Sequence, residues 1–78
     1  MGSTRNDSLN KAFGINMKKL RESEEITQEE LSGRCNLALS QVGRIERGLL
    51  NPTLGTMHVI AKGLGVDLKT LCDFEFTE

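Results

Sequence analysis

The feature that most constrains the fold is a capping box in the segment Thr27-Gln28-Glu29-Glu30. In such a box the threonine hydroxyl accepts the backbone N–H of Glu30, and the Glu30 carboxylate accepts the backbone N–H of Thr27. This reciprocal pairing marks the start of an α-helix. Asn36 favours the left-handed backbone conformation that ends helices, so the sequence predicts one short helix over residues 28–35.

Four further segments have the apolar spacing of helices. They cover about residues 9–23, 39–47, 54–64 and 68–72. They are bounded by residues that favour helix ends, namely Ser8, Gly48, Thr53, Gly65 and Asp67. The side chains predicted to face inward are Leu9, Phe13, Met17, Leu20, Leu31, Cys35, Val42, Ile45, Leu54, Met57, Ile60, Ala61, Leu64, Leu68, Leu71 and Cys72.

Short helices joined by loops of a few residues predict an all-α protein. Residues 1–7 are polar and without periodicity, so we expect a disordered N-terminal segment. A single compact five-helix domain is expected over residues 8–78, and its C-terminal end is a candidate dimerisation segment or tail. No alternating strand pattern competes with this interpretation.

Composition narrows the class of protein. The chain has 78 residues and a formal net charge of −1, whereas proteins that coat nucleic acids without sequence preference depend on a large positive excess. No apolar run approaches the roughly 20 residues that span a bilayer, and the N-terminus lacks the apolar stretch of a secretion signal. We therefore expect a cytoplasmic protein. Cys35 and Cys72 are expected to stay free in that reducing compartment, without a metal or other cofactor, because no CxxC motif or paired histidine accompanies them.

Five segments, in this order, resemble a known family: Met17-Lys18-Lys19-Leu20-Arg21, Ile26-Thr27-Gln28-Glu29-Glu30-Leu31, Val42-Gly43-Arg44-Ile45-Glu46-Arg47-Gly48, Asn51-Pro52-Thr53-Leu54 and Ile60-Ala61-Lys62-Gly63-Leu64-Gly65-Val66. The family is that of the Cro/C1-type helix-turn-helix proteins. It includes phage repressors, restriction-modification controller proteins and many antitoxins. The resemblance implies a lambda-repressor-like fold that binds double-stranded DNA, with the helix over residues 39–47 in the major groove and the helix over residues 28–35 across the backbone.

In that arrangement the face of the third helix opposite Val42 and Ile45 is available to DNA. Arg44 is the first candidate for base contact, because a guanidinium donates two bonds to guanine. The alternative for Arg44 is a phosphate contact or free solvation. Leu39 could touch only a thymine methyl group or pack against a loop. The full set of candidate base contacts is Arg44, Ser40, Gln41, Leu39 and Gly43, where the missing side chain of Gly43 would let the protein backbone approach DNA closely.

The resemblance also implies contacts with the DNA backbone and one structural ion pair. Gln28 is expected to contact a phosphate and to brace the third helix, although an exposed first-turn residue is the simpler alternative. Arg21 and Glu46 are expected to form a partly buried pair. The candidate phosphate contacts are Gln28, Arg47, Asn51, Thr53 and Lys18.

The sequence departs from the family pattern at three positions. Ala38 stands where a Ser or Thr usually caps the third helix. Gly33 and Gly43 lie inside the second and third helices, where glycine lowers helix stability. We expect these departures to affect the rigidity of the DNA-binding helix and not the fold.

Repressors of this design pair so that two recognition helices lie one DNA turn apart, so we expect a homodimer. The candidate interface is Leu68, Leu71, Phe74 and Phe76, unless the Phe side chains fold back onto the core. A regulator of this length resembles the controller proteins more than the longer phage repressors. The alternative function is a protein-interaction module such as an antitoxin. An enzyme is not expected, because His58 is alone and no nucleophile and base pair is visible.

Overall fold

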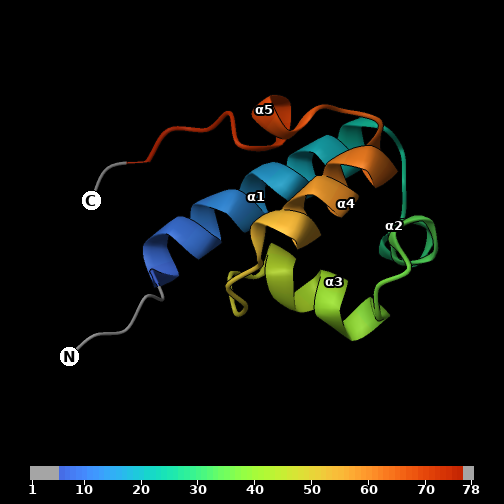
Figure 1. The fold of residues 1–78 in the computed structure, drawn as a ribbon, viewed down its shortest axis with the longest axis horizontal. Coiled ribbons are helices and arrows are strands. Elements are labelled where there is room, and N and C mark those ends of the chain that lie inside the picture. The colour runs from blue at the N-terminus through green and yellow to red at the C-terminus, as the bar shows by residue number, and fades with distance from the viewer. Residues whose placement is uncertain (1–5, 77–78) are drawn as a thin grey trace.

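The computed structural model describes residues 6–76. These residues form five helices and no strand: α1 (Asp7–Ser23), α2 (Gln28–Cys35), α3 (Leu39–Glu46), α4 (Leu54–Leu64) and α5 (Leu68–Leu71). Helix α1 contacts α3 and α5, while α4 contacts α2 and α5. In Figure 1, α3 and α5 lie on opposite sides of the molecule, with α3 at its lower edge. The predicted all-α, five-helix architecture is confirmed.

Local side-chain caps explain where the helices begin. The capping box is present, with the Glu30 N–H 3.0 Å from Thr27 Oγ1 and the Thr27 N–H 2.9 Å from Glu30 Oε1. The predicted caps at Thr53 and Asp67 are also present. The predicted cap at Ser8 is wrong. Asn6 accepts the Leu9 N–H at 2.9 Å and α1 begins at Asp7, so these two residues belong to the domain and not to the N-terminal segment. Residues 1–5 lie outside the described range.

Eleven buried apolar residues form one core. They are Phe13, Met17, Ile26, Leu31, Cys35, Val42, Ile45, Ile60, Ala61, Leu64 and Leu71. Three predicted inward positions are wrong. Leu9 is 39% exposed, because α1 turns Asn10 inward instead. Leu54 is 65% exposed on the first turn of α4. Cys72 is exposed because it lies beyond the end of α5.

Two glycines allow α1 to cross the end of α3 at close range. A Cβ at Gly14 would collide with the carbonyl oxygens of Ile45 and Glu46. Gly48 has a φ of 76°, and a Cβ there would lie 2.7 Å from Lys11 Cα. The C-terminal end of α3 is therefore held directly against the backbone of α1. No helix within residues 6–76 is long and apolar enough to span a bilayer.

Candidate nucleic-acid interface

Helices α2 and α3 are joined by a turn of three residues. The backbone conformation of Asn36 and a hydrogen bond from Ser32 define the shape of this turn. Asn36 takes the predicted left-handed conformation, with a φ of 55°. The Ser32 hydroxyl donates to the Leu37 carbonyl oxygen at 2.7 Å. Sequence reasoning missed this contact of Ser32, because a serine inside a helix carries no signal for the loop it will reach. The turn fixes the relative direction of the two helices.

Helix α3 is divided sharply into a buried face and an exposed face. Val42 and Ile45 are fully buried, as predicted. Of the predicted base contacts, Arg44, Ser40 and Leu39 are exposed, and Gln41 is partly buried. The exposed face therefore presents one guanidinium, one hydroxyl and one apolar side chain within about two helical turns.

Gly43 has a role that the sequence did not indicate. It is buried, and a Cβ at this position would lie 3.3 Å from Arg47 Nη1 and 4.0 Å from the Gln28 side-chain amide. The absence of a side chain at Gly43 thus makes room for two side chains of the same molecule. Gln28, Gly43 and Arg47 are brought together where the first turn of α2 meets α3. A close approach of the protein backbone to DNA at Gly43 stays a prediction.

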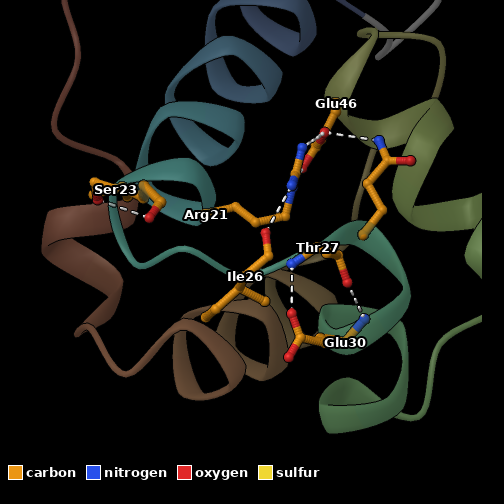
Figure 2. A network of polar contacts seen from close by, with 8 residues as sticks. Arg21, Ser23, Ile26, Thr27, Glu30 and Glu46 are labelled. Carbon is orange, nitrogen blue, oxygen red and sulfur yellow. Dashed lines mark hydrogen bonds and ion pairs between the residues drawn. The ribbon is translucent and has the colours of Figure 1, made fainter.

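The predicted ion pair of Arg21 and Glu46 is present and buried. Arg21 Nε lies 2.6 Å from Glu46 Oε2, and its Nη2 lies 3.1 Å from Oε1. Figure 2 shows the guanidinium between Glu46 and the Ile26 carbonyl oxygen, which accepts a third bond at 2.8 Å. These contacts raise the pKa of Arg21, mainly through the hydrogen bond to Glu46. The network joins the end of α1, the start of α2 and the end of α3.

Gln28 completes this network from the first turn of α2. Its Nε2 donates to Glu46 Oε1 at 2.9 Å. The predicted bracing of the third helix by Gln28 is therefore present. The Gln28 amide oxygen is an acceptor, so it makes no bond to the Glu46 carboxylate, and the side chain is only partly buried.

The other predicted phosphate contacts are dispersed. Arg47, Asn51, Thr53 and Lys18 are all exposed. Arg47 caps the end of α3, and Lys18 lies on α1. The Thr53 hydroxyl accepts the Thr56 N–H and donates to Thr56 Oγ1, both at 3.0 Å. This commitment of the hydroxyl to capping α4 makes Thr53 the weakest of the predicted contacts.

The predicted dimer interface needs a correction. Leu71 is fully buried and belongs to the core, so it offers no surface to a second copy. Phe74 packs edge-to-face on Phe13, with ring centroids 6.4 Å apart, which agrees with the alternative that it folds back. Leu68 and Phe76 are partly buried. The remaining candidate surface therefore consists of Leu68, Phe74 and Phe76, which are all partly buried.

The C-terminal segment is fixed to α1 by a residue that the sequence did not single out. The Asn16 side-chain amide donates to the Leu71 carbonyl oxygen at 2.7 Å and to the Thr70 carbonyl oxygen at 3.3 Å. A polar residue on a long amphipathic helix gives no sign of which distant carbonyl it will reach. Asn16 thereby fixes where the chain leaves α5.

The two cysteines form no disulfide, and the acidic residues within residues 6–76 form no cluster of metal ligands. Cys35 is buried and Cys72 is exposed, and both are free thiols. Burial raises the pKa of the Cys35 thiol. No group of three or more His, Cys, Asp or Glu side chains in this range could hold a metal ion.

The chain is similar to known regulators in both sequence and structure. The Helix-turn-helix family model matches residues 17–71. The chain is 38% identical over 63 residues to the control protein C.BamHI of Bacillus amyloliquefaciens, covering 80% of this chain and 78% of that protein.

Two solved structures support the same relationship. The restriction-modification controller protein C.AhdI of Aeromonas hydrophila superposes with a TM-score of 0.78 and 31% identity, covering 80% of this chain and 94% of that one. The controller protein C.Esp1396I was solved as a tetramer in complex with its natural 35 base-pair operator. It superposes with a TM-score of 0.73 and 34% identity, covering 76% of this chain and 78% of that one. Together with the α2–turn–α3 geometry, these matches establish that the chain belongs to the Cro/C1-type helix-turn-helix family.

Proposed function

We propose that the protein is a sequence-specific, double-stranded DNA-binding transcriptional regulator that acts as a homodimer in the cytoplasm, without catalytic activity. The observation that carries the proposal is the exposed face of α3, which holds Arg44 on a helix whose opposite face is fully buried. The DNA major groove is about 12 Å wide and accepts one helix of this kind.

Arg44 is the residue that we assign to base recognition. Its side chain is exposed. A guanidinium carries only hydrogen-bond donors, so it needs acceptors on the base edges of the groove. Guanine offers O6 and N7 side by side, which match two guanidinium donors and supply about 1–3 kcal/mol of discrimination. Ser40 and Gln41 are assigned to neighbouring base edges, and Leu39 to a thymine methyl group.

The backbone contacts are assigned to Gln28, Arg47, Asn51 and Lys18. Gln28 sits at the N-terminus of α2, where free N–H groups and the helix dipole favour a phosphate. Because its amide also donates to Glu46, a phosphate bound there would be tied to the position of α3. The backbone contacts would orient the helix, and the base contacts would select the site.

A homodimer would place two α3 helices about 34 Å apart on a two-fold-symmetric site. Support comes from the controller protein relatives, one of which is a tetramer on its operator. Within the family, similarity to C.BamHI and C.AhdI favours a role as a restriction-modification controller.

Selection of bound fragments from a random duplex library tests the proposal. We expect enrichment of a two-fold-symmetric sequence with a conserved guanine in each half. In the Arg44→Ala variant the guanine preference should relax, while Lys62→Ala, which removes an exposed charge from α4, should enrich the wild-type site. Failure to enrich any sequence at moderate salt would contradict DNA recognition and favour a protein partner instead.

A further inference from the structure

Gly43 lies inside α3, where a glycine makes the helix less stable than an alanine would. A Cβ added at Gly43 would lie 3.3 Å from Arg47 Nη1, which is closer than the roughly 3.5–4.0 Å at which nonbonded atoms pack best. Gly33 also lies inside a helix, but a Cβ there would have no neighbouring atom within 4 Å. Gly43 therefore differs from Gly33 in having an arginine side chain beside the space of the missing methyl group.

Helix geometry explains why Arg47 reaches this space. Long side chains in an α-helix point back toward its N-terminus and cover the residue one turn earlier, and Gly43 precedes Arg47 by four residues. The side-chain amide of Gln28, from the first turn of α2, lies 4.0 Å from the same Cβ position. The missing side chain of Gly43 thus lets the Arg47 guanidinium lie back along α3, on the side where Gln28 is found.

The Arg47 guanidinium has no anionic partner within residues 6–76. Its side chain is exposed, and the buried ion pair of this region belongs to Arg21 and Glu46. Both Glu46 oxygens already accept hydrogen bonds, from Arg21 and from Gln28. Gln28 Nε2 donates one hydrogen to Glu46 and keeps the other. Arg47 and Gln28 therefore both retain donors for an anion outside the chain.

We propose that Gly43 is a positioning residue for DNA binding. Because it carries no side chain, the Arg47 guanidinium lies beside Gln28, where both donate to the phosphates of the DNA backbone. This inference rests on the proposed function, since it takes DNA as the anion that Arg47 and Gln28 meet. It assigns Gly43 an effect that passes through Arg47, whereas a direct approach of the Gly43 backbone to DNA would not need Arg47.

The salt dependence of binding to the duplex selected by the wild-type protein measures this contact. Each phosphate that a protein neutralises contributes about 0.9 to the slope of log affinity against log salt concentration. We expect Gly43→Ala to lower the slope by about one per half-site and to bind about tenfold more weakly, as the loss of one charge-assisted hydrogen bond allows. Its melting temperature should be no lower than that of the wild type, because alanine favours the helix and the exposed Arg47 side chain is free to move aside.

A double-mutant cycle shows whether Gly43 acts through Arg47. Arg47→Ala should weaken binding and lower the slope as Gly43→Ala does. The double variant Gly43→Ala/Arg47→Ala should then bind no more weakly than Arg47→Ala alone. Gly33→Ala is the matched control, because it makes the same substitution inside α2 with no neighbouring atom to displace. It should leave both the affinity and the slope unchanged.

Three outcomes would overturn this inference while the proposed function stands. The first is a wild-type slope in Gly43→Ala. The second is an equal loss of affinity on Gly43→Ala with and without Arg47, which would mean that DNA itself approaches Gly43. The third is a wild-type slope in Arg47→Ala, which decides the matter even if Gly43→Ala does not fold. A wild-type protein that binds no duplex would instead overturn the proposed function, and this inference with it.

Discussion

The two ends of α3 are held in opposite ways. At the C-terminal end Glu46 is buried and bonded to Arg21 and Gln28, which come from two other helices. At the N-terminal end Ala38 provides no side-chain cap, and Leu39 and Ser40 are exposed. The C-terminal end is fixed by buried side-chain bonds, whereas the N-terminal end follows the turn after α2 and has no side-chain cap.

This difference separates positioning from recognition within a single helix of eight residues. The buried network determines where α3 lies, and the exposed face determines what it contacts. Substitutions in the buried network should therefore change stability. Substitutions on the exposed face should change DNA binding while the protein stays folded.

The largest effect is expected from breaking the buried network. Arg21→Ala would leave the Glu46 carboxylate buried without its partner, at a cost of about 3–5 kcal/mol. Equilibrium unfolding in urea measures this loss. The double variant Arg21→Met/Glu46→Leu removes both charges and should recover part of it. An Arg21→Ala protein as stable as the wild type would show that the network does not hold α3.

A matched pair of glycine variants tests the close contact between α1 and α3. Gly14→Ala would push a methyl group into the carbonyl oxygens of Ile45 and Glu46, and should destabilise the protein by about 1–3 kcal/mol. A Cβ added at Gly33 would have no neighbouring atom within 4 Å. Gly33→Ala should therefore stabilise α2 by about 0.5–1 kcal/mol. Thermal unfolding followed by circular dichroism compares the two. Changes of the same sign in both variants would argue against the close contact.

Adding a cap to the free end of α3 should reduce the contrast between its ends. Ala38→Ser supplies the missing hydroxyl and should raise stability by about 1 kcal/mol. Amide hydrogen exchange of the first turn of α3 measures the local effect, which should be slower exchange there than in the wild type. Unchanged protection would mean that another group already satisfies this helix end.

A smaller, pH-dependent effect is expected at the start of α2. Two groups of Thr27 hold the pKa of the exposed Glu30 carboxyl below its ordinary value. The larger effect comes from the backbone N–H and the smaller one from the hydroxyl. A pKa lowered by folding means that the stabilisation is present above the pKa of the unfolded chain and is lost as the pH falls through the folded pKa. Glu30→Ala should therefore cost more stability at about pH 7 than at about pH 2.5. Glu29→Ala, which lies outside the box, is the control, and an equal pH dependence in both would contradict this account.

The sequence predicted the parts of the fold that depend on local chemistry. The caps at Thr27, Thr53 and Asp67 were identified because each lies directly before an apolar periodic segment. The start of α1 was missed because Asn6, Asp7 and Ser8 are all good caps, and only packing selects among them.

Contacts between distant segments were predictable only where the family resemblance supplied them. The Arg21–Glu46 pair followed from the resemblance, but the bond from Arg21 to the Ile26 carbonyl oxygen did not. The turn after α1 contains no glycine, and Glu25 itself takes the left-handed conformation there, with a φ of 56°. The bond from Asn16 to the Leu71 carbonyl oxygen and the space made by Gly43 depend on the three-dimensional arrangement of helices, which spacing along the chain does not encode.

The most direct test of the central claim is to measure DNA affinity and unfolding on the same samples of Arg44→Ala and Arg34→Ala. Both arginines are exposed in the last turn of their helices, α3 and α2. The DNA is the duplex selected by the wild-type protein. We predict that Arg44→Ala loses about 1–3 kcal/mol of binding free energy per half-site with unchanged stability, and that Arg34→Ala binds as the wild type does. Equal affinities for the two variants, or a loss of binding in Arg44→Ala that follows a loss of folding, would contradict the assignment of recognition to the exposed face of α3.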